Sequence, residues 1–253
     1  MSKTDPIKLT ADLIKCPSVT PADGGALKLI EAVISPRGFN CTKIVRNDIS
    51  NLFARWGSEK NGPTFCFNGH IDVVPPGDLN SWSFSPFSGK IKDGCIYGRG
   101  ACDMKSAIAA FISASTNYLE SYKPDGSIVL AITGDEEGKA KDGTLAIIDW
   151  MKDNQEHIDH CLIGEPTSRI RLGDTLKIGR RGSLTVNFTV VGIQGHVAYI
   201  DRANNPLTAL TNLLVELTKK PLDLGTNEFD PSSLVITTID TGNPAANIIP
   251  KIG

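Results

Sequence analysis

The apolar run SIVLAIT, at residues 127–133, limits the folds open to this chain more than any other segment. It is rich in β-branched residues and has no polar alternation, which predicts a strand buried on both faces. Shorter strand candidates are CTKIV from Cys41, NLFARW from Asn51, TFCFNG from Thr64 and HCLIG from His160. We expect the HCLIG strand to be buried as well.

Helical patterns separate these strands. Apolar residues near Ile7 and Leu13 indicate an opening helix, and those from Leu27 to Ile34 indicate a second helix that ends at Pro36. Further helices are predicted from Asp103 to residue 119 and over residues 144–151. Alternating strands and helices predict an α/β fold with a mixed, largely parallel sheet flanked by helices.

The pattern changes near residue 180. The segments SLTVNFTVVG (183–192) and SSLVITTID (232–240) alternate apolar and polar residues, as half-exposed strands do, and an amphipathic helix begins near Pro206 between them. We therefore expect a first domain over residues 1–180 and a smaller α+β domain over residues 181–253, with GRRG (179–182) at the boundary.

Composition excludes some partners. The net charge of −2 argues against wholesale binding to nucleic acid or to an anionic membrane, and no run of 18 apolar residues is present. The first residues lack the apolar core of a secretory signal, so we expect a cytoplasmic protein. None of the six cysteines forms a CxxC pair, and Cys66 and Cys161 lie in apolar runs, where we expect reduced core residues.

Polar side chains follow several predicted strands at the point where each one ends. His70 follows FCFNG, Glu136 and Glu137 follow SIVLAITGD, and Glu165 follows CLIG. Asp103 opens the helix after IYGRGAC. Ligands bind at the carboxyl edge of open α/β sheets, so these groups are expected to meet there.

Such a cluster suits a metal ion. Crowded carboxylates repel one another unless a cation offsets their charge, and one histidine with several carboxylates suits zinc, cobalt or manganese. Asp72 could accept the other N–H of the His70 ring. Each residue also has an ordinary explanation, as a loop histidine, a helix N-cap at Asp103 or a solvated Glu pair, and placement alone leaves both interpretations open.

Four strings together carry a resemblance: GHIDVVP, GRGACDMK, TGDEEG and IGEPTS. In this order they resemble the dinuclear zinc aminoacylase and carboxypeptidase family of metallohydrolases. The resemblance implies a zinc-peptidase-like catalytic domain and a lid or dimerisation domain. It also implies two Zn²⁺ per subunit, with Co²⁺ as a substitute.

The resemblance assigns roles to the same residues. His70 and Glu165 match ligands of the first metal, Asp103 matches the carboxylate that bridges both metals, and Glu137 matches a ligand of the second. Glu136 matches the catalytic general base, and Asp72 matches the aspartate that orients the histidine. His157 and His160 precede their strand, so we expect them at the opposite edge of the sheet, as surface residues.

Further residues are implied outside the metal cluster. His196, in GIQGHVAY, matches a histidine that reaches the active site of the partner subunit in a homodimer formed through the lid domain. Arg180 and Arg181 carry guanidinium groups that suit substrate carboxylates, and Asn247 matches a substrate contact.

The resemblance implies a metal-dependent amide hydrolase that acts on an N-acylated amino acid. The alternatives are another N-deacylase of the family or a non-catalytic remnant that binds metal or dimerises. Family members continue beyond the point that matches Gly253 and carry the last metal ligand, a histidine, in that segment. We therefore expect a C-terminally truncated chain in which both domains are incomplete.

Overall fold

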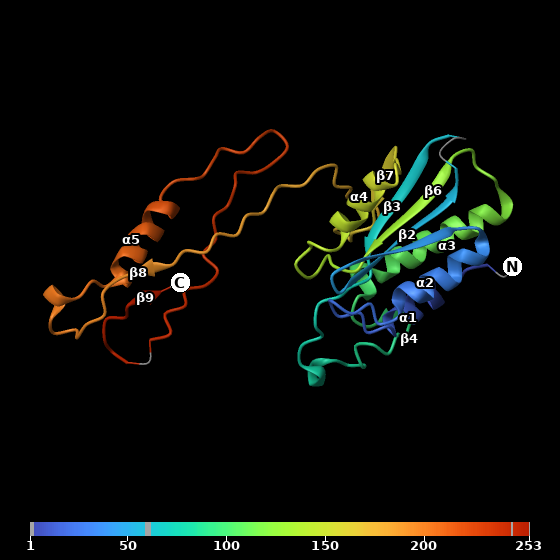
Figure 1. Cartoon of the computed structure of the whole chain (residues 1–253). Coiled ribbons are helices and arrows are strands. Elements are labelled where there is room, and N and C mark those ends of the chain that lie inside the picture. The colour runs from blue at the N-terminus through green and yellow to red at the C-terminus, as the bar shows by residue number, and fades with distance from the viewer. Residues whose placement is uncertain (1–2, 59–61, 244, 253) are drawn as a thin grey trace. The chain divides into compact units, whose positions relative to one another are not determined.

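The computed structural model describes residues 3–58, 62–243 and 245–252 (Figure 1). The chain divides into two compact units, Met1–Leu176 and Lys177–Gly253. The first unit holds the sheet and four of the α-helices described below, and the second is built around one helix.

The described part of the first unit contains a five-stranded sheet in the order β1-β2-β6-β3-β7. Its strands are β1 (Asn40–Arg46), β2 (Ile49–Gly57), β3 (Thr64–His70), β6 (Ser127–Thr133) and β7 (His160–Ile163). Strands β1, β2 and β6 pair antiparallel, whereas β3 runs parallel to both β6 and β7. The sheet is therefore mixed, as predicted, but two of the four pairings among its described strands are parallel, so it is not largely parallel. Its parallel part contains the three strands that end at the polar residues.

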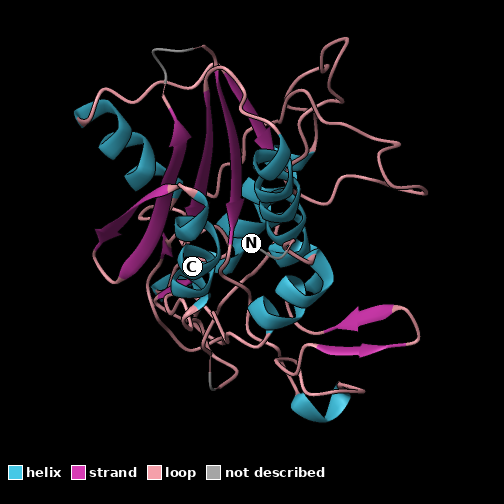
Figure 2. Cartoon of the chain, turned by 90° about the vertical axis from the view of Figure 1, so that its right-hand side faces the viewer, coloured by secondary structure: helices cyan, strands magenta, loops and turns pink. Residues whose placement is uncertain are grey.

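Helices cover both faces of this sheet (Figure 2). They are α1 (Pro6–Ile14), α2 (Ala26–Ile34), α3 (Ser106–Ser121) and α4 (Thr144–Asp153). Leu130 and Ile132 of β6 belong to the core formed with α1, α2 and α3. Val129 and Ala131 belong to the core formed with α4. The run SIVLAIT is thus buried on both faces, as its composition predicted.

Local sequence explains where the helices begin and end. The Asp5 side chain accepts hydrogen bonds from the backbone N–H groups of Ile7 and Lys8, and Pro6 occupies the first turn of α1. Helix α2 ends at Ile34, just before the short helix η1 (Ser35–Arg37) that contains Pro36.

Strand β7 differs from the prediction, because it is exposed along its whole length. Leu162 and Ile163 are exposed apolar residues, and Cys161 is exposed, whereas its register partner Cys66 is buried. The reason is position: β7 is the last strand of the sheet, and no other described strand pairs with its outer edge. The prediction of a buried strand and of Cys161 as a core residue is therefore wrong.

Smaller elements complete the first unit. The short helix η3 (Leu79–Ser81) precedes a hairpin of β4 (Lys90–Lys92) and β5 (Cys95–Tyr97), and the π-helical turn η4 (Ala101–Lys105) precedes α3. Asp103 lies inside η4 with non-helical dihedral angles, and Lys105 is the N-cap residue of α3. Asp103 is therefore not the N-cap of this helix.

The second unit contains α5 (Pro206–Thr218), the short helix η5 (Ile200–Arg202) and a two-residue pairing of β8 (Val190–Val191) with β9 (Lys251–Ile252). The Asn205 side chain caps α5 by accepting from the N–H of Leu207, and Pro206 starts the helix, as predicted. No helix among the described residues is long and apolar enough to cross a membrane.

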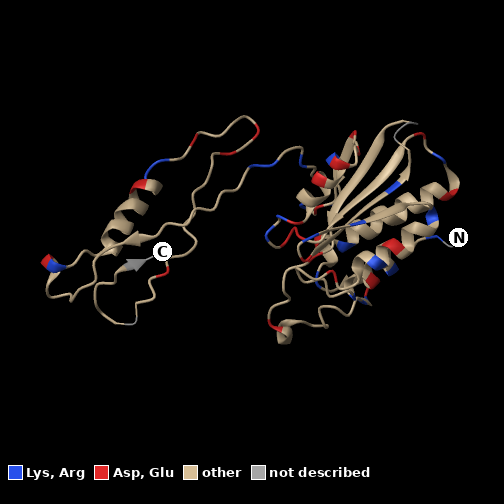
Figure 3. Ribbon diagram, viewed as in Figure 1, with Lys and Arg blue, Asp and Glu red and all other residues tan. Residues whose placement is uncertain are grey.

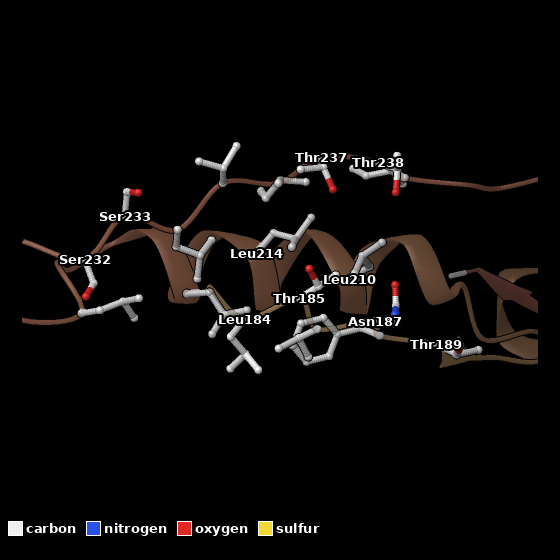
Figure 4. Close-up of a pocket in the computed structure, with 18 of the residues that line it drawn as sticks. Leu184, Thr185, Asn187, Thr189, Leu210, Leu214, Ser232, Ser233, Thr237 and Thr238 are labelled. Carbon is white, nitrogen blue, oxygen red and sulfur yellow. The ribbon is translucent and has the colours of Figure 1, made fainter. Parts of the chain in front are cut away.

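The two alternating segments of this unit do not form the predicted strands. Apart from β8, residues 183–192 and 232–240, all described, have no strand pairing. Alternation fixes which side chains share a face, but a strand also needs a partner for its backbone. Both segments instead flank α5 and line a trough of about 570 Å³, with Leu210 and Leu214 on the helix side (Figure 4).

Candidate metal centre

His70 lies at the centre of the polar cluster in the first unit. It is the last residue of β3, pairs in register with Thr133 of β6 and is 1% exposed. Its Nδ1–H donates to the backbone carbonyl of Asp72 at 2.9 Å. Its Nε2 lies 2.9 Å from Oδ1 of Asp103 and 3.6 Å from Oε1 of Glu165. The backbone thus fixes the ring so that Nε2 points at the carboxylates.

The carboxylates reach this point from three separate turns, which lie after β6, after β7 and within η4. Figure 3 colours the acidic residues of the chain red. Among the described residues, two groups bring their ligand atoms within 4.8 Å of one another. One is His70, Asp103 and Glu165, and the other is His70, Glu136 and Glu137. The first group is the set matched to the first metal. The second group differs from the set matched to the second metal: it contains Glu137 as expected, but it has His70 in place of Asp103.

The charges in this cluster perturb its titration. Burial lowers the pKa of His70, but the carboxylate and carbonyl of Asp72 and the charge of Glu165 raise it to about 9. Burial, the charge of Asp103 and that of Glu136 raise the pKa of Glu137, although His70 opposes the shift. A protonated imidazole therefore offsets part of the negative charge, which is the task of a cation.

The turn that carries Asp103 is fixed by its neighbour Met104. Met104 is fully buried, and its Sδ accepts a hydrogen bond from the backbone N–H of His70 at 3.2 Å. Its terminal methyl lies over two glycines, because a Cβ added at Gly69 or at Gly164 would come within 2.7 Å or 2.9 Å of it. The thioether therefore locks η4 onto the ends of β3 and β7.

A buried lysine ties the same turn to α1. Lys105 is fully buried, and its Nζ donates to the carbonyl oxygens of Leu13 at 3.0 Å and Cys16 at 2.8 Å. These carbonyls lie at the end of α1, where helical carbonyls lack partners within the helix. The contact ties η4 to the end of α1.

Asp72 is fully buried and contacts both His70 and the turn that carries Glu136 and Glu137. Its carboxylate lies 3.6 Å from Nδ1 of His70, so the ring N–H is bonded to the carbonyl of Asp72 and not to its carboxylate. The carboxylate accepts instead from the hydroxyl of Thr20 and from the N–H groups of Glu136 and Glu137. Burial raises the pKa of Asp72, but the nearby His70 ring and the hydrogen bonds from Thr20 and the two amides lower it below its ordinary value.

Thr20 was not predicted from the sequence. Its hydroxyl lies 2.8 Å from Oδ2 of Asp72, 52 residues further along the chain. Its segment runs beside the segment after β3, because Ser18 donates its hydroxyl to the carbonyl of Ile71 and accepts the N–H of Val73. A Ser-Val-Thr-Pro stretch has no ligand spacing, so only the fold reveals this contact.

His157 and His160 lie away from the cluster, as predicted. Both are exposed, and His160 pairs with Phe65 near the start of β3, at the opposite end from His70. His157 lies 3.4 Å from the carboxylate of Asp159.

The remaining predicted site residues belong to the second unit. Arg180, Arg181 and His196 are exposed. Arg181 donates to the carbonyls of Asp230 and Pro231, and Nδ1 of His196 accepts from the N–H of Ala198. Asn247 is half-buried and lines a pocket of about 280 Å³ together with Gln194 and Asn243.

The parallel strands end at an acidic edge around one buried imidazole, an arrangement that suits a metal ion. The chain belongs to the family described as peptidase family M20/M25/M40, which matches residues 66–245. Membership implies the use of a divalent metal, and the nitrogen and carboxylate donors at His70 fit such an ion.

The chain is also similar to particular members of this family whose names are curated. The chain is 56% identical over 248 residues to a succinyl-diaminopimelate desuccinylase of Cereibacter sphaeroides, covering 98% of this chain and 65% of that protein. It is 53% identical to succinyl-diaminopimelate desuccinylase 1 of a Ruegeria species, covering 100% of this chain and 66% of that protein. The chain thus spans about 65% of the length of these relatives.

Solved structures agree on the fold. The M20 family metallo-carboxypeptidase Sso-CP2 from Sulfolobus solfataricus superposes with a TM-score of 0.62 at 18% identity, over 85% of this chain and 49% of that one. The aminopeptidase PepT from Bacillus cereus gives a TM-score of 0.63 at 17% identity, over 98% of this chain and 64% of that one.

Proposed function

We propose that the complete protein is a zinc-dependent amide hydrolase that converts N-succinyl-LL-2,6-diaminopimelate and water into succinate and LL-2,6-diaminopimelate. The reaction would serve cytoplasmic lysine and diaminopimelate biosynthesis. The observation that carries the chemistry is the buried Nε2 of His70 among the carboxylates of Asp103, Glu165 and Glu136. The names of relatives that are 53–56% identical over nearly the whole chain support the substrate.

The donors divide between two Zn²⁺ ions, for which Co²⁺ can substitute. His70, Asp103 and Glu165 would hold the first ion, and Asp103 with Glu137 would contribute to the second. Bound cations of this kind polarise an amide carbonyl and lower the pKa of a nearby water. A histidine with carboxylates is a donor set that both metals accept.

Glu136 acts as the general base in this proposal. Its carboxylate is 44% exposed and lies 4.0 Å from Nε2 of His70, so it reaches the edge of the cluster while staying open to substrate. It takes a proton from the attacking water as the carbon–oxygen bond forms. It then passes the proton to the departing amine nitrogen as the carbon–nitrogen bond breaks.

The second unit would bind the substrate and the partner subunit. The guanidinium groups of Arg180 and Arg181 suit the carboxylates of a succinylated diamino acid. Asn247 is proposed as a further contact, and His196 as a residue that enters the site of the partner subunit. The domain of residues 181–253 would then be the lid through which a homodimer forms.

The test is a comparison of two substrates with the complete, metal-loaded protein. Release of succinate from succinyl-diaminopimelate should exceed deacetylation of acetylornithine, and Glu136→Gln at equal metal content is the matched control. Preference for acetylornithine would identify an acetylornithine deacetylase instead. Turnover of neither substrate by metal-loaded protein would indicate a non-catalytic remnant.

A further inference from the structure

Two residues beneath the acidic turn after β6 hold its backbone in place. The carboxylate of Asp72 accepts the N–H of Glu136 through both oxygens at 3.1 Å, and that of Glu137 at 3.0 Å. The hydroxyl of Thr20 donates to the same carboxylate at 2.8 Å. One buried anion therefore binds two successive amides of the turn that presents both glutamates.

The geometry of this contact leaves little freedom. Asp72 is 0% exposed, so its charge is compensated by donors of the protein. Its carboxylate repels those of Glu136 and Glu137, and the turn stays beside it because the main-chain N–H groups point at the anion. Other parts of the turn have other anchors: Asp135 accepts the amides of Lys141 and Asp142.

His70 depends on a different atom of Asp72. Its Nδ1–H donates to the main-chain carbonyl at 2.9 Å, whereas the carboxylate is 3.6 Å away. That carbonyl is held by the path of the backbone, since the neighbouring Ile71 donates its N–H to the carbonyl of Thr133 and accepts the hydroxyl of Ser18. A change in the carboxylate of Asp72 thus leaves the acceptor for His70 in place.

We propose that Thr20 and the carboxylate of Asp72 are positioning residues for Glu136 and Glu137. The inference rests on the proposed function for the roles of the two glutamates. It adds Thr20 to the site and gives the carboxylate of Asp72 a second task.

Three substitutions separate the contacts. Thr20→Val removes one donor at nearly constant volume, and Thr20→Ser keeps the hydroxyl. Asp72→Asn replaces one acceptor oxygen by an NH₂ group, which cannot accept the amides of Glu136 and Glu137. Because Thr20→Val is the milder change, it preserves the test if Asp72→Asn fails to fold.

The first measurement is hydrogen exchange at single amides, read by NMR of the complete protein with metal bound. Thr20→Val should speed exchange at Glu136 and Glu137 by about three- to tenfold, the effect of one lost hydrogen bond, and Asp72→Asn should speed it more. Thr20→Ser should restore slow exchange. The matched control is Asp135→Asn. It should speed hydrogen exchange at the amides of Lys141 and Asp142 and leave exchange at the amides of Glu136 and Glu137 unchanged.

The second measurement is metal affinity at the His70 site together with kinetics. Metal affinity should change less than about threefold in Thr20→Val, whereas kcat should fall by up to about 10²-fold at similar KM, the loss that a misplacement of about 1 Å can cause. Unchanged exchange at Glu136 and Glu137 in Thr20→Val would overturn the proposal. Failure of the proposed function is distinguishable, because wild-type protein would then lack turnover while the exchange result still reports on the anchor.

Discussion

Metal removal and the His70→Ala variant test the centre directly. Both groups of ligand atoms share Nε2 of His70, so its loss should disable both. A metal at about 100 times its Kd stabilises the folded state by about 2.7 kcal/mol. In a domain the size of the unit Met1–Leu176, each kcal/mol moves the Tm by about 2–4 °C. We therefore expect added Zn²⁺ to raise the Tm of the metal-free protein by about 5–11 °C.

The assay is thermal unfolding followed by circular dichroism, after removal of metal with a chelator and with each variant compared with its own metal-free form. His70→Ala should lose nearly the whole shift, and Glu137→Ala should keep most of it. His160→Ala is the matched control, since this exposed histidine lies at the opposite end of β3 and β7. A full shift in His70→Ala, or its loss in His160→Ala, would refute the assignment.

The remaining predictions concern the base, the pH and the partner subunit. Glu136→Gln should keep its metal and lose about 10²- to 10⁴-fold in kcat, the usual contribution of a general base; metal analysis that finds a greater loss in Glu136→Gln than in Glu137→Gln would show that the two roles are exchanged. The folded pKa of His70, about 9, lies above its ordinary 6.5, so in metal-free protein its stabilisation is present below pH 6.5 and is lost as the pH rises through 9. The same proton competes with metal, so metal affinity should rise by about tenfold per pH unit up to about pH 9 and should not do so in His70→Ala, as a titration series would show. His196→Ala should impair turnover without loss of metal, and mixing it with Glu136→Gln should restore some activity; verified heterodimers without rescue would exclude action across the dimer.

The sheet and its helices were predictable because burial leaves a direct mark on sequence. SIVLAIT has apolar residues for two cores, and both cores form. The run HCLIG also has consecutive apolar residues, yet β7 is an edge strand. A run of this length specifies that a strand forms but not how many neighbours it has. The prediction of strands over residues 183–192 and 232–240 was wrong for a related reason. Alternation determines which side chains share a face, but it does not determine which strand pairs with the backbone.

The site also has a part that could be predicted from the sequence and a part that could not. The ligand candidates could be found because each follows a predicted strand or turn, and parallel strands end at one edge. Thr20 could not, because its contact with Asp72 joins residues 52 positions apart and has no local pattern. The task of Asp72 was only partly visible: sequence spacing brings it near His70, but the choice between its carbonyl and its carboxylate is made by the backbone path.

The packing of Met104 against Gly69 and Gly164 limits which substitutions this chain can accept at these positions. The three positions share one volume, so a change at one is tolerated only with a compensating change at another. Alanine at Gly69 or Gly164 would displace the thioether and, through the peptide bond, the neighbouring Asp103. A shorter side chain at position 104 should relieve the clash at Gly69, so that double substitution should be less harmful than Gly69→Ala alone. Alanine at Gly164 would also meet the ring of Phe67, at 2.5 Å. The position of Asp103, a proposed metal ligand, thus depends on the packing of three neighbouring residues that are not proposed to bind metal.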